Sequence, residues 1–382
     1  MSLPHGLNWA MQSRFAGAGL LKAVLEVSGV MRKVMSIVMG CLALSTIVAA
    51  DEEPFADAIQ TVFDERFVEF VAADSRVEIL APDAGQDIGW AEGPLWVADL
   101  DSLLFSDVAN DTIYRWNEAT GVTTYLRPSG HPADDAGHAW RGSNGLGVDG
   151  DGNLILAQQS NRTLSRMRAT LQNPAPDYEV LVERYRGQKL NSPNDLVVNA
   201  AGDIYFTDPP YGLSGFENSP DIELGFFGVF RLTRQGDLSI VSKALEKPNG
   251  LALSADQRTL YVSNSDDDAP QIVAIDLDAE GNSIGSRLFF DARSLVTDGA
   301  GSTDGMAMYP GDMLFTSIPN GVGILSPQGE LLGKIALGQV TNLAFDASFN
   351  YLYITTPNRL LRLRIKAGPG FPAATHSVPE DE

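Results

Sequence analysis

The 382-residue sequence is poor in the side chains that carry thiol and imidazole chemistry. It has one cysteine, Cys41, and four histidines, and it contains no H-E-x-x-H motif. A disulfide framework needs paired cysteines, and a conventional zinc site needs several Cys or His ligands at fixed spacings. The sequence therefore excludes a disulfide-rich fold and gives no support to a thiol enzyme or a zinc hydrolase.

Positive charge is also scarce. The chain has 27 Lys and Arg against 49 Asp and Glu, which gives a formal net charge of −22. Proteins that bind the phosphate backbone need clustered cationic side chains, so we expect no nucleic-acid partner. An acidic chain of this kind suits small molecules or cations as its partners.

One short apolar run lies near the N-terminus. Arg32 and Lys33 precede an apolar stretch over residues 34–48, and small residues up to Ala50 precede an acidic segment. This order is typical of a secretory signal peptide, and the stretch is too short to span a bilayer comfortably. We expect cleavage near Ala50, which would remove Cys41 and leave an exported protein, periplasmic or secreted, without a stable membrane anchor. N-terminal sequencing of the exported protein tests this expectation.

The rest of the chain contains a repeat. Six segments open with Glu, Asn or Asp and continue into an apolar run, a Gly or Asp turn and an aromatic-rich strand. The openers are spaced by 52, 50, 55, 55 and 38 residues, and they are Glu92, Asn144, Asn194, Asn249, Asp304 and Asn342. A period of roughly 40 to 50 residues with several short strands in each unit is typical of a β-propeller.

The strands within a repeat can be predicted from β-branched and aromatic runs between Gly, Asn and Asp turns. In the third and fourth repeats they fall at residues 196–198, 204–207, 228–232, 238–241, 251–254, 259–263 and 271–275. The sequence therefore predicts an all-β, six-bladed β-propeller. We expect an N-terminal extension and signal peptide over residues 1–50 and a single propeller domain over residues 51–382, with a strand from about Phe63 to Leu80 closing the ring.

Two apparent catalytic motifs lie in predicted turns. Residues 281–285 match the G-x-S-x-G pattern, which requires a strand before it and a helix after it, but here it lies between strands. Residues 149–153 begin like a calcium-binding helix-loop-helix loop, yet Leu154 replaces the required Gly and Ser160 replaces the final Glu. We expect both segments to be turns between strands.

The repeat openers are better candidates for a functional site. In a propeller the innermost strands begin around one axis, so side chains at equivalent positions of different blades can face one point. Four openers, Glu92, Asn194, Asn249 and Asp304, supply two carboxylates and two amide oxygens, a set that suits Ca²⁺. The alternative is that these openers, several of which are followed by Gly, are only turn residues at blade edges. Four of them in register favour the metal site.

Five segments around these residues carry a family resemblance. They are Trp90-Ala-Glu92-Gly-Pro-Leu-Trp96, Ser192-Pro-Asn194-Asp195, Phe206-Thr-Asp208-Pro-Pro-Tyr211-Gly212, Pro248-Asn249-Gly250 and Thr303-Asp304-Gly305. In this order they resemble the gluconolactonase and regucalcin family, also called the senescence-marker-protein family, whose members are six-bladed calcium-dependent lactonases. The resemblance runs from about residue 80 to residue 366, and the Asp-Pro-Pro-Tyr-Gly segment is especially similar to the bacterial gluconolactonase branch.

The resemblance implies a reaction and a role for each residue. The chain would be a lactonase that opens a lactone ring, such as that of gluconolactone, with Ca²⁺ polarising the carbonyl and a carboxylate activating water. The implied metal ligands are Glu92, Asn194, Asn249 and Asp304. The implied catalytic bases are Asp304 or Asp195, and the residues at the substrate mouth are Asn144, Asn194, Tyr211 and Asp195.

The chain departs from the family at two places. Gln158 and Gln159 stand where many bacterial relatives carry an acidic residue and His, and Ser192 stands where animal members carry Arg. Both departures bear on the substrate more than on the metal. Asp208 has either a pocket role or a structural role in its turn. His138 and Trp140 lie in the long loop of residues 127–143, from which they could reach the mouth, but we favour a place at the surface.

Two other functional classes stay open. A phosphotriesterase or arylesterase would use the same metal site, and a broad apolar mouth would favour it, whereas polar side chains would favour sugar lactones. A non-catalytic metal-binding propeller is the third possibility, because a fold does not settle a function.

Overall fold

The computed structural model describes residues 55–57, 59–81, 87–130, 140–297 and 301–366. The expected signal segment over residues 1–50 and His138 lie outside these ranges, so cleavage near Ala50 stays a prediction. Among the described residues, no helix has the length and apolar character needed to cross a membrane.

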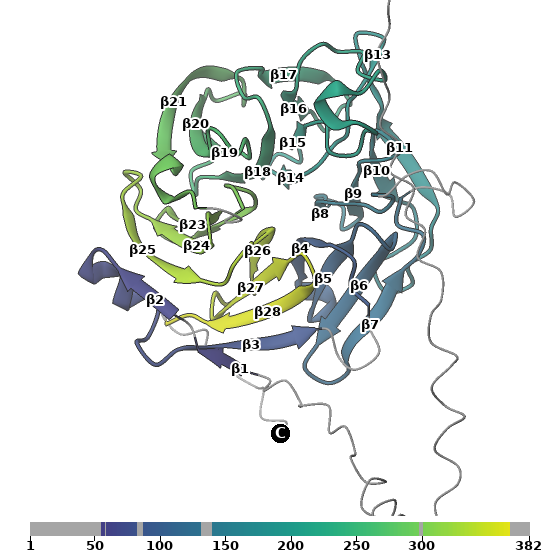
Figure 1. The fold of residues 1–382 in the computed structure, drawn as a ribbon. Helices are drawn as coiled ribbons and strands as arrows, with labels where there is room; N and C mark the ends of the chain where they lie inside the picture. Colours follow the sequence, from purple (N-terminus) through teal and green to yellow (C-terminus); the bar gives the residue numbers. More distant parts are fainter. Residues whose placement is uncertain (1–54, 58, 82–86, 131–139, 298–300, 367–382) are drawn as a thin grey trace, which may run out of the picture. The chain divides into compact units, whose positions relative to one another are not determined.

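The described residues form six antiparallel sheets arranged as the blades of a propeller (Figure 1), which confirms the predicted fold. Blades 1 to 4 each have four strands. Blade 1 contains β4 (Ala91–Val97), β5 (Ser102–Asp107), β6 (Thr112–Asn117) and β7 (Gly121–Leu126); blade 2 contains β8 (Leu146–Val148), β9 (Leu154–Gln158), β10 (Thr163–Met167) and β11 (Tyr178–Val182). Blade 3 contains β14 (Leu196–Val198), β15 (Ile204–Asp208), β16 (Gly228–Leu232) and β17 (Leu238–Ser242); blade 4 contains β18 (Pro248–Leu253), β19 (Thr259–Asn264), β20 (Gln271–Leu277) and β21 (Ser283–Asp291).

Blades 5 and 6 each gain strands from the N-terminal part of the propeller. Blade 5 contains β22 (Met306–Tyr309), β23 (Met313–Ile318), β24 (Gly321–Leu325) and β25 (Leu331–Ala336), and β2 (Ile59–Val62) pairs with β25. Blade 6 contains β26 (Asn342–Phe345), β27 (Tyr351–Thr356) and β28 (Arg359–Arg364), followed by β3 (Arg76–Ala81) and β1 (Phe55–Asp57). A separate hairpin joins β12 (Arg184–Tyr185) to β13 (Gln188–Lys189).

Ring closure agrees with the sequence prediction only in part. β3 pairs with β28 and closes the ring, as expected for a strand between Phe63 and Leu80. The start of that range is different, because residues 65–69 form a short 3-10 helix, η1 (Glu65–Glu69). Phe67 of η1 is fully buried between blades 5 and 6. The pairing of β2 with blade 5 was not expected.

The hydrophobic core is divided among the interfaces between blades. Six clusters of buried apolar residues each span two neighbouring blades. In β9, Leu154 and Leu156 pack toward blade 1, whereas Ile155 and Ala157 pack toward blade 3. Successive side chains of a strand point to opposite faces, so a strand buried on both faces is apolar along its whole length. This explains the continuous apolar runs of the repeat.

The openers lie at the beginning of the innermost strands. Strands β4, β8, β14, β18, β22 and β26 contact one another in this order, and β26 contacts β4 to complete the ring. Glu92 and Asn249 are the second residues of β4 and β18, and Asn342 begins β26. The other three openers precede β8, β14 and β22 by two residues. Six polar side chains are therefore brought to one end of the axis.

Glycines next to the openers permit this convergence. A Cβ on Gly93, whose φ is +50°, would lie 2.1 Å from the carbonyl oxygen of Asn144 in the next blade. A Cβ on Gly250 would lie 2.3 Å from the carbonyl oxygen of Asp304. The Glu92-Gly93 and Asn249-Gly250 pairs therefore lie where inner strands of neighbouring blades touch, and they are not hairpin turns at blade edges.

The two apparent catalytic motifs are turns, as predicted. Gly281 lies in the turn before β21, and Ser283 begins that exposed edge strand, so a strand stands where the motif requires a helix. Asp149 closes the turn between β8 and β9 by accepting from the backbone N–H of Asn153 at 2.9 Å.

The close approach of blades 4 and 5 predicts a specific sensitivity. We expect Gly250→Ala to lower the free energy of unfolding by about 1–3 kcal/mol, because the added methyl group would force β18 away from Asp304. Gly150→Ala is the matched control, since its Cβ would meet nothing closer than 3.9 Å. Urea unfolding of both variants measures the difference, and equal midpoints would contradict the proposed contact.

Candidate functional site

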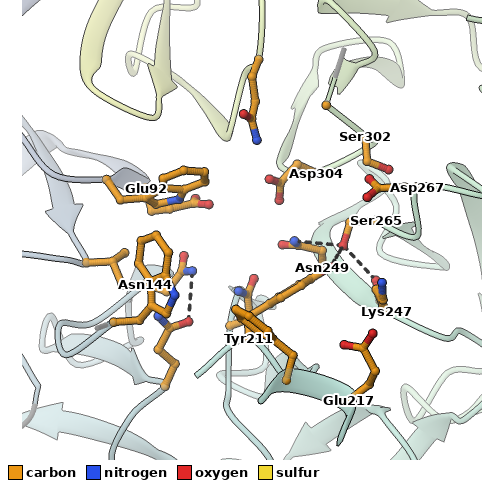
Figure 2. A pocket seen from close by; sticks show the side chains of 18 residues that line it. Glu92, Asn144, Tyr211, Glu217, Lys247, Asn249, Ser265, Asp267, Ser302 and Asp304 are labelled. Atoms are coloured by element: carbon orange, nitrogen blue, oxygen red, sulfur yellow. Dashed lines mark hydrogen bonds between the residues drawn. The ribbon is translucent and has the colours of Figure 1, made fainter. Parts of the chain in front are cut away.

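A cavity of about 360 Å³ lies where the inner strands begin. Figure 2 shows that Glu92 and Asp304 face each other across its open centre, with Asn144 on the Glu92 side and Asn249 on the Asp304 side. Six of the residues singled out from the sequence line this cavity, namely Glu92, Asn144, Asn194, Tyr211, Asn249 and Asp304. The structure therefore brings together side chains that are up to 212 positions apart in the chain.

The cavity floor presents oxygen atoms that lack protein partners. Oδ1 of Asp304 and Oδ1 of Asn144 are both buried and accept no hydrogen bond. The amide nitrogen of Asn144 donates weakly to Oε1 of Gln159 at 3.5 Å, and that of Asn249 donates to Oγ of Ser265 at 3.2 Å. Both amides thus use their nitrogen away from the centre, which leaves their oxygens for the cavity.

This arrangement fits a hard divalent cation. Buried oxygens without partners are costly, and a cation such as Ca²⁺ binds carboxylate and amide oxygens. In the described part of the chain, no three His, Cys, Asp or Glu side chains gather as metal ligands. A centre at this position would therefore depend on the amides of Asn194 and Asn249 as well as on Glu92 and Asp304.

The carboxylates are crowded and buried. Burial, followed by the nearby charge of Asp195, raises the pKa of Glu92 to about 8. Burial, followed by the charges of Glu92 and Asp195, raises the pKa of Asp304 well above its ordinary value. Burial also raises the pKa of Asp195 to about 6. A bound cation would oppose these effects by favouring the ionised forms.

Asp195 lies beside the cavity without lining it. Neighbouring residues near a strand direct their side chains to opposite sides, so Asn194 faces the cavity and Asp195 lines the axial channel below. Nδ2 of Asn342 donates to Oδ2 of Asp195 at 3.3 Å and also hydrogen-bonds to Glu92. The sequence identified Asn342 as an opener but gave no sign of this bridge.

Several residues around the mouth have clear structural roles. Asp208 is fully buried and accepts from the backbone N–H and the side-chain amide of Asn191, so it ties the end of β15 to the segment before β14. Oγ of Ser192 donates to the carbonyl of Pro209 and accepts from Gly212 N at 2.9 Å. Ser192 therefore holds the turn that carries Tyr211.

The expectation for Trp140 is wrong. It lines the cavity and packs edge-to-face against Trp90, with ring centroids 5.1 Å apart. Gln159 also lines the cavity. Glu217, Lys247 and Asp267 add charged groups to the lining (Figure 2). No sequence motif included them, because they lie in three separate loops, after β15, before β18 and after β19.

A comparison with models of known protein families finds a match over the part of the chain that contains these residues. The model described as "SMP-30/Gluconolactonase/LRE-like region" matches residues 90–358. The chain belongs to the SMP-30/gluconolactonase family. This confirms the resemblance seen in the sequence, and the matched range includes the openers of all six repeats.

Individual members of the SMP-30/gluconolactonase family are also similar over most of their length. A gluconolactonase from Zymomonas mobilis subsp. mobilis is 37% identical over 313 residues, covering 80% of this chain and 86% of that protein. A gluconolactonase structure from Xanthomonas campestris is 29% identical with a TM-score of 0.67, covering 82% of this chain and 98% of that one. A solved putative gluconolactonase is 28% identical with the same TM-score, covering 80% and 98% of the two chains.

The raised pKa values of the buried carboxyl groups predict how the free energy of unfolding of the metal-free protein depends on pH. Glu92 keeps a proton in the folded state up to about pH 8, whereas its ordinary pKa is 4.5. Between these values the folded state binds more protons than the unfolded state, so the free energy of unfolding should fall as pH rises. Asp195 and Asp304 act in the same direction.

Glu92→Gln should therefore flatten this pH dependence, whereas Glu280→Gln in an exposed turn should leave it unchanged. Urea unfolding of chelator-treated protein between pH 5 and pH 8 provides the measurement. If the free energy of unfolding of the wild type did not change with pH, or if the Glu92 variant showed the same change, the raised pKa of Glu92 would be contradicted.

Proposed function

We propose that the protein is a gluconolactonase-like lactone hydrolase whose cavity holds one divalent cation, Ca²⁺. The observation that carries the proposal is the group of buried, unpartnered oxygens at the floor of a cavity formed by the blade openers. The identity to a protein named as a gluconolactonase supports the same reaction class.

The four proposed ligands divide into two charged and two neutral groups. The carboxylates of Glu92 and Asp304 balance the charge of a divalent cation, and the amide oxygens of Asn194 and Asn249 complete an oxygen-only set. When bound, Ca²⁺ would polarise the lactone carbonyl as a Lewis acid. All other steps are assigned to side chains of the protein.

Asp304 is the proposed general base. Its Oδ1 is buried at the cavity and has no hydrogen-bond partner, so a carboxylate with two oxygens can hold the cation and still accept a proton from water. Asp195 is less suited to this role, because it lines the axial channel and its Oδ2 accepts from Asn342. The proton taken from water would then go to the departing ring oxygen, and the product would be the open hydroxy acid, which ionises in water to its carboxylate.

The lining of the cavity supports a sugar lactone such as gluconolactone as the substrate. A sugar ring has C–H groups that pack on aromatic rings and hydroxyl groups that need polar partners. Trp90 and Trp140 offer the aromatic surface, and Oδ1 of Asn144 is a free acceptor. A volume of about 360 Å³ is also within the usual range for small-molecule sites.

An aryl ester or organophosphate is the second candidate, and the aromatic side of the cavity favours it. The charged side chains of Glu217, Lys247 and Asp267 weigh against it, because the wide apolar mouth expected for such substrates would lack them. A substrate panel separates these candidates.

In the panel, purified protein is assayed with sugar lactones, an unsubstituted lactone, an aryl ester and an organophosphate, after chelation and after addition of Ca²⁺. We expect sugar lactones to be the best substrates, activity to disappear on chelation and Ca²⁺ to restore it. Hydrolysis that survives complete chelation would contradict the metal, and a preference for the aryl ester or organophosphate would contradict the lactone.

Asp304→Asn tests the base separately from the ligand. An amide oxygen can still coordinate the cation but cannot accept the proton, so kcat at saturating Ca²⁺ should fall by about 10²- to 10⁴-fold. Asp237→Asn, in an exposed turn of blade 3, is the matched control and should keep the wild-type rate. Full activity of the Asp304 variant at high Ca²⁺ would show that Asp304 is a ligand and not the base.

A further inference from the structure

Behind Asn249, three hydrogen bonds meet at one hydroxyl group. Oγ of Ser265 lies 3.2 Å from Nδ2 of Asn249 and 3.2 Å from the carbonyl oxygen of Lys247, and it also contacts the hydroxyl of Tyr211. Figure 2 shows Ser265 on the side of Asn249 that faces away from the centre of the cavity, and Tyr211 below Asn249. Tyr211 comes from the loop after β15 in blade 3, whereas Ser265 directly follows β19 in blade 4.

The donors and acceptors of this network have one fully paired assignment. A serine hydroxyl has one hydrogen and two lone pairs, and a backbone carbonyl can only accept. The hydrogen of Ser265 therefore goes to Lys247, and its lone pairs accept from the Asn249 amide and from the Tyr211 hydroxyl. The backbone N–H of Ser265 also donates to the carbonyl oxygen of Lys247 at 2.9 Å. Lys247 is two residues before Asn249, so this bond holds Ser265 next to the Asn249 side chain.

This assignment determines which way the Asn249 amide faces. If the amide were turned over, its oxygen would meet Oγ of Ser265, and the hydroxyl hydrogen could reach it only by leaving the Lys247 carbonyl. The NH₂ group would then point into the cavity, where it would repel a cation. Turning the amide over would therefore cost the hydrogen bond from Ser265 to Lys247 and leave Asn249, which is only 6% exposed, with no oxygen directed at the cavity.

We propose that Ser265 and Tyr211 are positioning residues that hold the oxygen of the Asn249 amide toward the cation. This inference rests on the proposed function, because it assumes that Asn249 is a ligand. Tyr211 thus has a role that the sequence did not suggest, since its hydroxyl is used to orient a ligand and is not free to bind substrate. Groups that orient a metal ligand typically change metal affinity or activity by about 10- to 100-fold when they are removed.

Three variants test the proposal by calorimetric titration of chelator-stripped protein with CaCl₂. Ser265→Ala should weaken Ca²⁺ binding by about 10- to 100-fold, with kcat at saturating Ca²⁺ close to wild type. Tyr211→Phe should have a smaller effect, because the bond between Asn249 and Ser265 remains. Ser265→Thr keeps the hydroxyl group and should restore the affinity.

Tyr205→Phe is the matched control for Tyr211→Phe. The hydroxyl of Tyr205 also links blade 3 to blade 4, through the carbonyl of Gly281 at 2.8 Å, but it is remote from the cavity lining. Its removal should leave Ca²⁺ affinity unchanged. Circular dichroism melting of each variant identifies any that fails to fold, and the comparison of the two tyrosine variants decides the question if Ser265→Ala is among them.

The outcomes separate this inference from the function on which it rests. Wild-type protein that binds no Ca²⁺ would overturn the proposed cation site itself. Wild-type protein that binds Ca²⁺ with an affinity equal to that of folded Ser265→Ala would overturn only the positioning role. Equal losses in the Tyr211 and Tyr205 variants would also overturn it, because they would reflect blade packing in general.

Discussion

The close approach of six inner strands around one axis is the constraint on which the site depends. Gly93 and Gly250 permit contacts between blades that any side chain would block. The same strands bury both of their faces against neighbouring blades, so a core cluster lies at every interface around the ring. An opener therefore cannot move without disturbing two interfaces, which gives its side chain a fixed direction in a rigid environment.

The convergence concentrates negative charge where water has little access. The charge of Asp195 raises the pKa of Glu92, and the charges of Glu92 and Asp195 raise the pKa of Asp304. Asn342 is the neutral link between Glu92 and Asp195. A cluster of this kind is unfavourable for the metal-free protein, because burial and repulsion both disfavour the ionised forms. A divalent cation changes the sign of this interaction, so the proposed site would contribute to stability only when it is loaded.

The fold and most of the cavity lining could be predicted because they depend on local patterns that recur. The repeat of openers gave five cavity residues, the family resemblance added Tyr211, and β-branched runs gave strands close to those of blades 3 and 4. The position of Asp195 could not be predicted in this way. Asn194 and Asp195 point in opposite directions, and the sequence does not say which of the two faces the cavity and which the channel. Trp140 packs against Trp90 at the cavity, a contact between residues far apart in the sequence that the repeat pattern does not show.

Contacts between repeats explain the other omissions. Ser265 follows an ordinary strand, and its importance comes from Asn249 in the adjacent strand and Tyr211 in the neighbouring blade. The pairing of β2 with blade 5 joins segments more than 270 residues apart, which periodicity within one repeat cannot reveal. Residues that act through non-local contacts leave little signal in a single sequence.

The central claim is that openers from four blades bind one cation at the axis. Diffraction from crystals grown with Ca²⁺, measured at a wavelength where calcium scatters anomalously, tests it most directly. We expect one anomalous peak in the cavity, about 2.3–2.6 Å from oxygens of Glu92, Asn194, Asn249 and Asp304. Calcium-saturated crystals with no peak there, or with a peak held by other residues, would contradict the claim.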